Sequence, residues 1–165
     1  LKDLAKESIF NIINHSNKFN IEIEKSNILD LFSGVGSFGI ECLSRGAKSV
    51  VFIENYSGVL PILKKNLGSL KSNFNYEIIE QDINNKNSFL GLKIKFNIIF
   101  LDPPFKDKNL KNILKIINKE KILQKNGIII IHRHKDEKDI LPQNFRIIEE
   151  KKYGISKILF LSYLN

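Results

Sequence analysis

The chain carries short apolar runs that are separated by longer stretches with apolar residues at helical spacing. Short runs bounded by glycine or polar residues predict buried strands. They lie at residues 28–32, 49–54, 76–80, 96–101 and 127–132. Helices are predicted over residues 2–14, 57–70 and 107–123, and between the glycine-rich turn after residue 32 and Gly46.

The order of these elements predicts an α/β fold. Strands that alternate with helices form a parallel sheet with helices on both faces. The last segment, "FRIIEEKKYGISKILFLSYL", indicates two strands joined near Tyr153-Gly154, and so short a connection forces an antiparallel pair. We therefore expect one domain over residues 1–165. It should hold a doubly wound, Rossmann-like, mostly parallel seven-stranded sheet with an antiparallel last strand.

The composition favours a partner that carries negative charge. The 26 Lys and Arg outnumber the 18 Asp and Glu, and the net charge is +8. This excess favours nucleic acid first. No apolar run approaches the ~20 residues of a membrane span, and no signal peptide is visible. The single cysteine, Cys42, excludes an internal disulfide and a cysteine-rich metal site, which fits a reducing cytoplasm.

A glycine-rich turn follows the first strand and opens a helix. It has the pattern Gly34-x-Gly36-x-x-Gly39, and Glu54 ends the next strand 20 residues after Gly34. This is the fingerprint of a nucleotide site: the glycines allow close backbone approach, and the acid binds a ribose hydroxyl. Both NAD and S-adenosyl-L-methionine contain adenosine, so the fingerprint alone does not choose between them.

Two further acids favour S-adenosyl-L-methionine. Asp30 stands four residues before Gly34, where an acid suits the amino acid and the sulfonium cation of this cofactor. NAD would instead need a helix N-terminus for its pyrophosphate. Asp82 follows the third strand, either as a partner for the adenine amino group or as a solvated loop acid.

The stretch "FLDPPF" ends the fourth strand on an acid, Asp102, followed by Pro103, Pro104 and Phe105. Ligands of open α/β sheets bind beyond the carboxyl ends of the strands. The prolines stiffen the loop and hold Asp102 extended, and the aromatic ring can stack on a planar base. In isolation "DPPF" is only a turn, but after a glycine loop it suits methylation of an exocyclic amine. A carboxylate and a carbonyl that accept the two N–H bonds leave the nitrogen lone pair aimed at the methyl group.

These motifs together resemble the class I S-adenosylmethionine-dependent methyltransferases that act on amino nitrogens. More closely, "ILDLFSGVGSFGIECLSRGAKSVVFIE", "FNIIFLDPPF" and "KKYG" resemble the RsmD family, whose members methylate N2 of a guanine in bacterial small-subunit ribosomal RNA. The resemblance implies that Asp102 to Phe105 hold the target base. It implies cofactor contacts at Asp30, Gly34, Gly36, Glu54 and Asp82, and it matches Lys6-Glu7 to a basic–acidic pair in the family's first helix. The implied partner is ribosomal RNA or the small ribosomal subunit, and we expect a monomer without metal.

Two departures from the family pattern stand out. The family has a basic N-terminal hairpin that helps to grip RNA, and this chain lacks it. Because the chain begins at Leu1 and contains no methionine, we expect a fragment or a processed chain. The family often has Glu where His132 stands. We interpret His132, Arg133 and His134 as residues of a sheet edge, with a phosphate contact by Arg133 as the minor option. A metal site at these histidines is a poor match.

Other functions stay open at this point. A DNA amino-methyltransferase acting on adenine N6 or cytosine N4 would share "DPPF", but no extra domain for sequence readout is visible. An RNA-binding assembly factor could keep the fold without catalysis. An NAD oxidoreductase explains the glycines but not "DPPF", and a protein glutamine methyltransferase would carry Asn in place of Asp102. Cys42 is interpreted as a small buried residue, which counts against methylation of a ring carbon.

Overall fold

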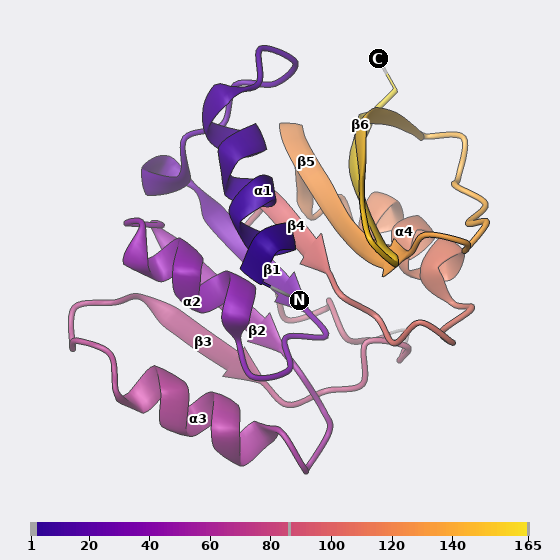
Figure 1. The fold of residues 1–165 in the computed structure, drawn as a ribbon. Helices are drawn as coiled ribbons and strands as arrows, with labels where there is room; N and C mark the ends of the chain where they lie inside the picture. Colours follow the sequence, from indigo (N-terminus) through magenta and orange to yellow (C-terminus); the bar gives the residue numbers. More distant parts are fainter. Residues whose placement is uncertain (1–2, 86, 165) are drawn as a thin grey trace.

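The computed structural model describes residues 3–85 and 87–164, and its elements alternate as the sequence predicts (Figure 1). Lys2, the first residue of the first predicted helix, lies outside the described residues. In chain order the elements are α1 (Asp3–His15), the short 3-10 helix η1 (Ile23–Lys25), β1 (Asn27–Leu31), α2 (Ser37–Ser44), β2 (Ser49–Ile53), α3 (Leu60–Gly68), β3 (Tyr76–Ile79), β4 (Phe96–Leu101), α4 (Leu110–Lys119), β5 (Leu123–His134), β6 (Phe145–Tyr153) and β7 (Ser156–Tyr163).

The strands form one seven-stranded sheet in the order β3-β2-β1-β4-β5-β7-β6. The first five strands along the chain pair in parallel, and β7 enters between β5 and β6 and is antiparallel to both. The predicted mostly parallel sheet with an antiparallel last strand is therefore confirmed. The turn between β6 and β7 contains Gly154, which has a left-handed φ of 55°. A residue without a side chain accommodates that conformation at low cost.

Helices cover both faces of the sheet, as predicted (Figure 1). Alternate strand residues face α1, α2 and α3 on one side, and the residues between them face α4 on the other. On the first side the ring of Phe38 in α2 stacks on Phe10 of α1 and on Phe100 of β4, with centroid distances of 5.4 and 4.2 Å. These rings fix α2, and hence the loop before it, against the centre of the sheet.

The end of α2 is set by Gly46, as the sequence predicts. Gly46 has a φ of 86°. Its N–H donates to the carbonyl of Leu43, and the N–H of Ala47 donates to the carbonyl of Cys42. These two bonds form a Schellman motif, which satisfies carbonyls that the helix would otherwise leave unpaired.

The boundary between α4 and β5 differs from the prediction. The helix predicted over residues 107–123 ends at Lys119, and Lys121 has a left-handed φ of 52°. The strand predicted over residues 127–132 covers Leu123–His134 instead. Pairing with β4, interrupted by a bulge, recruits the polar residues before Gly127 into the strand. At its other end β5 is two residues longer than predicted and includes Arg133 and His134.

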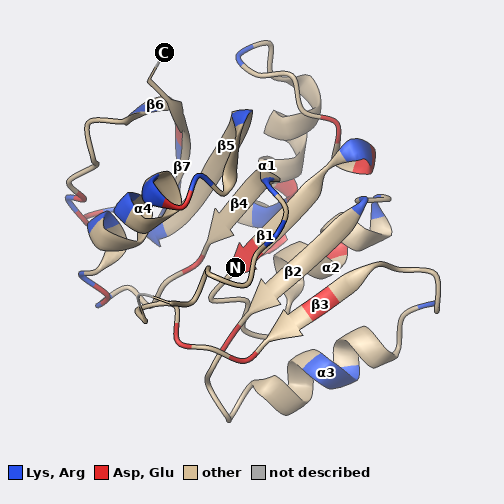
Figure 2. Ribbon diagram, turned by 180° about the vertical axis from the view of Figure 1, so that it is seen from behind, with Lys and Arg blue, Asp and Glu red and all other residues tan. Residues whose placement is uncertain are grey.

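The carboxyl ends of the parallel strands meet at one edge of the sheet, and acidic residues gather there (Figure 2). Asp30 lies near the end of β1, while Glu54 and Asp102 directly follow β2 and β4. Among the described residues, no helix is long and apolar enough to cross a membrane.

Candidate active site

The glycine loop between β1 and α2 adopts the tight turn that the sequence predicts. Gly34 and Gly36 have left-handed φ values of 56° and 86°. A Cβ atom on Gly36 would lie 2.6 Å from Leu63 Cδ1, so the loop packs closely on α3. At Gly34 a Cβ atom would meet nothing within 4 Å, so the backbone there is open at the carboxyl edge, where a bound nucleotide could approach it.

Gly39 allows α2 to pack closely against the sheet. A Cβ atom there would lie 2.7 Å from Phe52 Cζ and 2.9 Å from Asp30 Oδ2. We expect Gly39→Ala to lower the free energy of unfolding by about 1–3 kcal/mol, because the new methyl group overpacks this contact. Denaturant unfolding measures the change. Gly68→Ala is the matched control, since a Cβ there meets nothing within 4 Å. Equal stability of the two variants would contradict the packing role.

Asp30 is an almost fully buried acid, with 1% of its surface exposed. Its Oδ2 accepts a hydrogen bond from the Gly39 N–H at 3.0 Å, and its Oδ1 has no hydrogen-bond partner among the described residues. Burial raises the pKa of Asp30 well above its usual value. The Gly39 N–H opposes this rise, and the charges of Asp102 and Glu54 add to it. A buried carboxylate oxygen without a hydrogen bond lowers the stability of the fold, so Asp30 Oδ1 is a candidate contact for a polar group of a ligand.

Glu54 ties the glycine loop to the turn after β2. Its Oε2 accepts from the Gly34 N–H at 2.8 Å, and its Oε1 accepts from the N–H groups of Asn55 and Tyr56 at 2.9 Å. The carboxylate thus lies beside the glycine loop, as the fingerprint predicts. It carries three backbone hydrogen bonds, and a carboxylate has about four acceptor sites. A contact with a ribose hydroxyl stays a prediction.

Asp82 lies in the exposed loop after β3. Its Oδ1 accepts from the N–H of Asn84 at 2.9 Å, and its carbonyl accepts from the hydroxyl of Ser88. Both bonds are local turn contacts, and none of the contacts found for Asp82 joins it to the other predicted site residues. Its role at the adenine also stays a prediction.

The Asp102–Phe105 loop begins as a continuation of the sheet. The Asp102 N–H donates to the carbonyl of Leu31 in β1 at 3.3 Å, which brings this loop beside the glycine loop. Asp102 Oδ1 lies 2.7 Å from Nδ1 of His132, and Nε2 of His132 lies 2.9 Å from the hydroxyl of Ser156. Burial raises the pKa of Asp102, but the hydrogen bond and charge of His132 outweigh it, so the pKa lies below its usual value. Asp102 is therefore a carboxylate at neutral pH.

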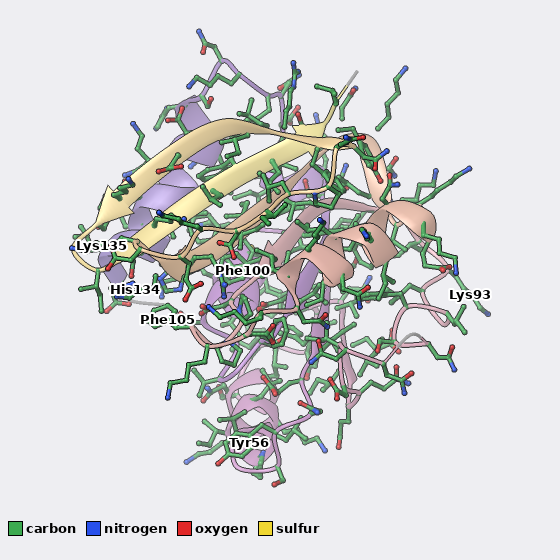
Figure 3. The ribbon with its side chains drawn as sticks, turned by 90° about the vertical axis from the view of Figure 1, so that its right-hand side faces the viewer. Tyr56, Lys93, Phe100, Phe105, His134 and Lys135 are labelled. Atoms are coloured by element: carbon green, nitrogen blue, oxygen red, sulfur yellow. The ribbon has the colours of Figure 1, made fainter. Side chains whose placement is uncertain are left out.

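Phe105 places a partly exposed ring at the mouth of this edge. The ring is edge-on to His132 and His134, with centroid distances of 5.8 and 5.5 Å. Figure 3 shows Phe105 and His134 close together at one end of the sheet. With 37% of the residue exposed, the ring is available for stacking on a planar ligand.

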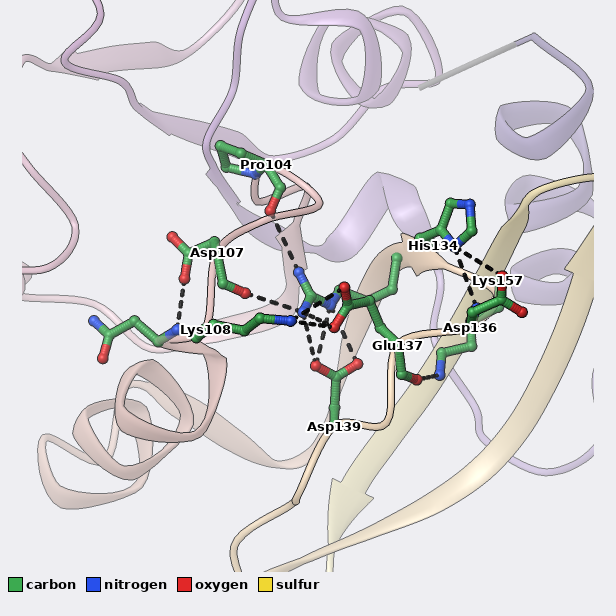
Figure 4. A network of polar contacts seen from close by, with 10 residues as sticks. Pro104, Asp107, Lys108, His134, Asp136, Glu137, Asp139 and Lys157 are labelled. Carbon is green, nitrogen blue, oxygen red and sulfur yellow. Dashed lines mark hydrogen bonds and ion pairs between the residues drawn. The ribbon is translucent and has the colours of Figure 1, made fainter.

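Arg133 follows His132 on β5, so it holds the same loop from the other face of the sheet. Figure 4 shows its partners Pro104, Asp107 and Asp139 gathered in one polar network. Its guanidinium donates to the carbonyls of Pro104 and Asp107 at 3.4 and 3.1 Å and pairs with the carboxylate of Asp139 at 2.8 Å. Arg133 is only 1% exposed. The phosphate contact weighed from the sequence is therefore wrong, because the guanidinium is buried and bound within the protein. One signal in the sequence could have indicated this position: adjacent residues of a strand point to opposite faces of the sheet, so Arg133 and His132 could not both face the site.

Cys42 has a structural role only, and the histidines do not form a metal site with other described residues. Cys42 is fully buried in α2, and burial raises the pKa of its thiol well above the usual value. The interpretation of a small buried residue is confirmed. Within the part of the chain that the structure describes, no group of three His, Cys, Asp or Glu side chains could hold a metal ion.

Comparison with known proteins adds independent evidence to this geometry. The model of the family described as "Conserved hypothetical protein 95" matches residues 1–162. The Haemophilus influenzae protein named "Ribosomal RNA small subunit methyltransferase D" is 35% identical over 93% of this chain and 77% of its own length. The chain belongs to this family, that of RsmD.

A second relative and a solved structure agree with this membership. The protein of the same name from Buchnera aphidicola subsp. Baizongia pistaciae is 36% identical over 97% of this chain and 78% of its own length. A crystal structure of a methylase from Haemophilus influenzae is 34% identical and superposes with a TM-score of 0.77, covering 99% of this chain and 98% of that one. The resemblance stated from the motifs is therefore confirmed, as is the Rossmann-like fold of a methyltransferase.

Proposed function

We propose that this protein transfers a methyl group from S-adenosyl-L-methionine to the exocyclic N2 amine of a guanine in bacterial small-subunit ribosomal RNA. The observation that carries the proposal is the Asp102 carboxylate. It is held at the end of β4, where its backbone N–H is bonded to Leu31, three residues before the glycine loop. The names of the relatives support the ribosomal RNA substrate, and the net charge of +8 suits a polyanion.

S-adenosyl-L-methionine would supply an electrophilic methyl group on a positively charged sulfur. The residues at the glycine loop fit this molecule. Asp30 offers a buried oxygen that lacks a partner among the described residues, and the charges of Asp102 and Glu54 act on it, so this edge is an acidic environment that would suit a positively charged sulfur. Gly34 leaves the loop backbone open, since a Cβ atom there would meet nothing within 4 Å, and Gly36 lets the loop pack on α3. Glu54 and Asp82 are proposed to meet the ribose and the adenine, respectively.

The Asp102–Phe105 loop would prepare the amine for reaction. The amine lone pair of guanine is delocalised into the ring, so the nitrogen is a weak nucleophile. Asp102 and a carbonyl of the loop would accept its two N–H bonds, and Phe105 would stack on the base. The lone pair would then be aimed at the methyl group, and the electron pair of the methyl–sulfur bond would stay on sulfur as the N–C bond forms. The excess proton on the methylated nitrogen would pass to the Asp102 carboxylate that accepts its N–H bond, and from there to solvent.

Methyl transfer to unmodified small ribosomal subunits tests the proposal. Labelled cofactor is supplied, the RNA is digested to nucleosides, and label in N2-methylguanosine is the expected result. Label in another nucleoside would overturn the guanine assignment. In a parallel assay with unmodified DNA as the acceptor, label in DNA but not in the subunits would favour a DNA amino-methyltransferase. Binding of subunits without any transfer would favour an assembly factor.

A ribosomal substrate would place the protein in the cytoplasm. We further propose that it acts there as a single-domain monomer.

The role of Glu54 gives a separate prediction. We expect Glu54→Ala to weaken cofactor affinity roughly ten- to a hundredfold, since hydrogen bonds to a charged group contribute about 1.5–3 kcal/mol each. Isothermal titration calorimetry measures the affinity. Glu41→Ala is the control, because the Glu41 side chain pairs with Arg45 on the surface of α2 and makes no other ion pair with the described residues. Unchanged affinity in Glu54→Ala would remove Glu54 from the cofactor site.

A further inference from the structure

Two buried side chains behind Asp102 have no role in the proposed chemistry. His132 is the third residue from the end of β5, and Ser156 is the first residue of β7. They are 5% and 7% exposed. Together with Asp102 they form a chain of hydrogen bonds: Oδ1 of Asp102 to Nδ1 of His132 at 2.7 Å, and Nε2 of His132 to Oγ of Ser156 at 2.9 Å.

The stiff loop does not by itself orient the carboxylate. Two prolines fix the backbone after Asp102, but the last side-chain torsion of an aspartate is broad and has no sharp minimum. A hydrogen bond to one carboxylate oxygen removes this freedom. Methyl transfer needs its reacting groups aligned, and a misplacement of about 1 Å can lower the rate about a hundredfold. The partner of Asp102 Oδ1 is therefore placed where it can affect the rate.

The donor and acceptor roles in the chain follow from the charge of Asp102. A carboxylate only accepts hydrogen bonds, so Nδ1 of His132 must carry the proton that it shares with Oδ1. In the neutral ring Nε2 then accepts from the Ser156 hydroxyl, and in the charged ring it donates to the same hydroxyl. Since a hydroxyl can do both, Ser156 holds the imidazole in either state.

The strand register explains why these three residues meet. Leu101 of β4 pairs with Ile131 of β5, and His132 pairs with Ile158 of β7. The next position along β4 and β5 sets Asp102 beside His132 on the same face. Ser156 is diagonal to His132 across the antiparallel pair, within reach of a polar side chain. The antiparallel strand thus supplies the second half of the support.

We propose that His132, held in place by Ser156, is a positioning residue that orients the Asp102 carboxylate toward the amine that is methylated. This inference rests on the proposed function, because it assigns His132 a part in the same reaction. It predicts that the bond at Nδ1 matters for turnover, whereas the cofactor and RNA affinities do not depend on it.

Two variants of similar polarity separate the two ring nitrogens. The amide nitrogen of His132→Asn lies near the position of Nδ1 and can still donate to Asp102. That of His132→Gln lies near the position of Nε2 and can still reach Ser156. We expect His132→Gln to lower kcat about a hundredfold, with KM for the subunit and cofactor affinity unchanged, and His132→Asn to keep most of the wild-type kcat. Ser156→Ala should give a smaller loss.

Comparing the two variants distinguishes a loss of positioning from a loss of folding. Both place an amide in the same buried position, so thermal unfolding should show similar stabilities. If His132→Gln keeps the wild-type kcat, or if both variants lose kcat and stability together, the positioning role is overturned. Transfer by the wild-type protein in the same assay shows that the proposed function itself stands.

A measurement without turnover decides the matter if the wild type transfers no methyl group. Long-range ¹⁵N NMR of the imidazole rings reports which nitrogen is protonated, and His132→Gln identifies the His132 signal among the three histidines. We expect an Nδ1–H signal in the wild type and in Ser156→Ala, and its loss in Asp102→Ala. A neutral ring protonated only at Nε2 in the wild type would overturn the inference.

Discussion

Replacing Asp102 by alanine will lower kcat for methyl transfer by about a hundred- to a thousandfold, while cofactor affinity stays close to that of the wild type. The expected size is that of removing one preorganised polar group from a site of charge development. Asp102 is hydrogen-bonded to His132, and we propose that it binds the amine and not the cofactor. Removing the carboxylate should therefore slow the methyl-transfer step itself. Single-turnover transfer of labelled methyl measures this step directly.

Asp102→Asn refines this experiment. Asparagine keeps the size of the side chain and can accept through one oxygen, but it lacks the charge. We expect it to retain more activity than alanine and far less than the wild type. Calorimetry with the cofactor confirms that each variant still binds. If Asp102→Ala keeps the wild-type kcat, Asp102 has no role in the reaction. If Asp102→Ala fails to bind the cofactor, Asp102 belongs to the cofactor site and not to the site of the target base.

Replacing Arg133 by alanine will destabilise the protein by about 3–5 kcal/mol, because removing one partner of a buried ion pair leaves the other charge unpaired. Asp139, the carbonyl of Pro104 and that of Asp107 would all lose a hydrogen bond. For a chain of this size the melting temperature should fall by roughly 6–20 °C. Differential scanning calorimetry measures the shift.

Arg146→Ala is the matched control for this prediction. Arg146 lies exposed on β6 and donates to the hydroxyl of Ser162 at 3.3 Å. Exposed contacts of this kind contribute little, so its melting temperature should change by no more than a few degrees. Equal shifts in the two variants would contradict the role of Arg133 as the internal support of the Asp102–Phe105 loop.

Much of the site could be predicted because its signals are local. The glycine turn, the acid that ends the next strand and the acid before two prolines are each a matter of spacing along a few residues. Local spacing also places Gly34, Glu54 and Asp102 after three of the parallel strands, β1, β2 and β4, and the carboxyl ends of parallel strands meet at one edge. The hydrogen bond from Gly34 to Glu54 spans 20 residues, yet the fingerprint anticipates their proximity.

The support of the site could not be predicted, because it depends on strand register. His132 is 30 residues from Asp102 and 24 from Ser156, and no motif joins them. Arg133 resembled a surface cation because the strand was expected to end at residue 132, whereas it ends at His134. Polar residues inside β5 hid its true length, and pairing with β4 and β7 overrode their weak strand preference.

The end of β5 links the alignment of the sheet to the proposed catalysis. His132 and Arg133 are neighbours in sequence, and they hold the same loop from opposite faces. A slip of one residue in the pairing of β5 would exchange the two faces. The imidazole would then lie against α4 and the guanidinium against the glycine-loop side. Under the proposed role of His132, an error in this pairing would inactivate the enzyme, so selection for turnover would also maintain the register of β5.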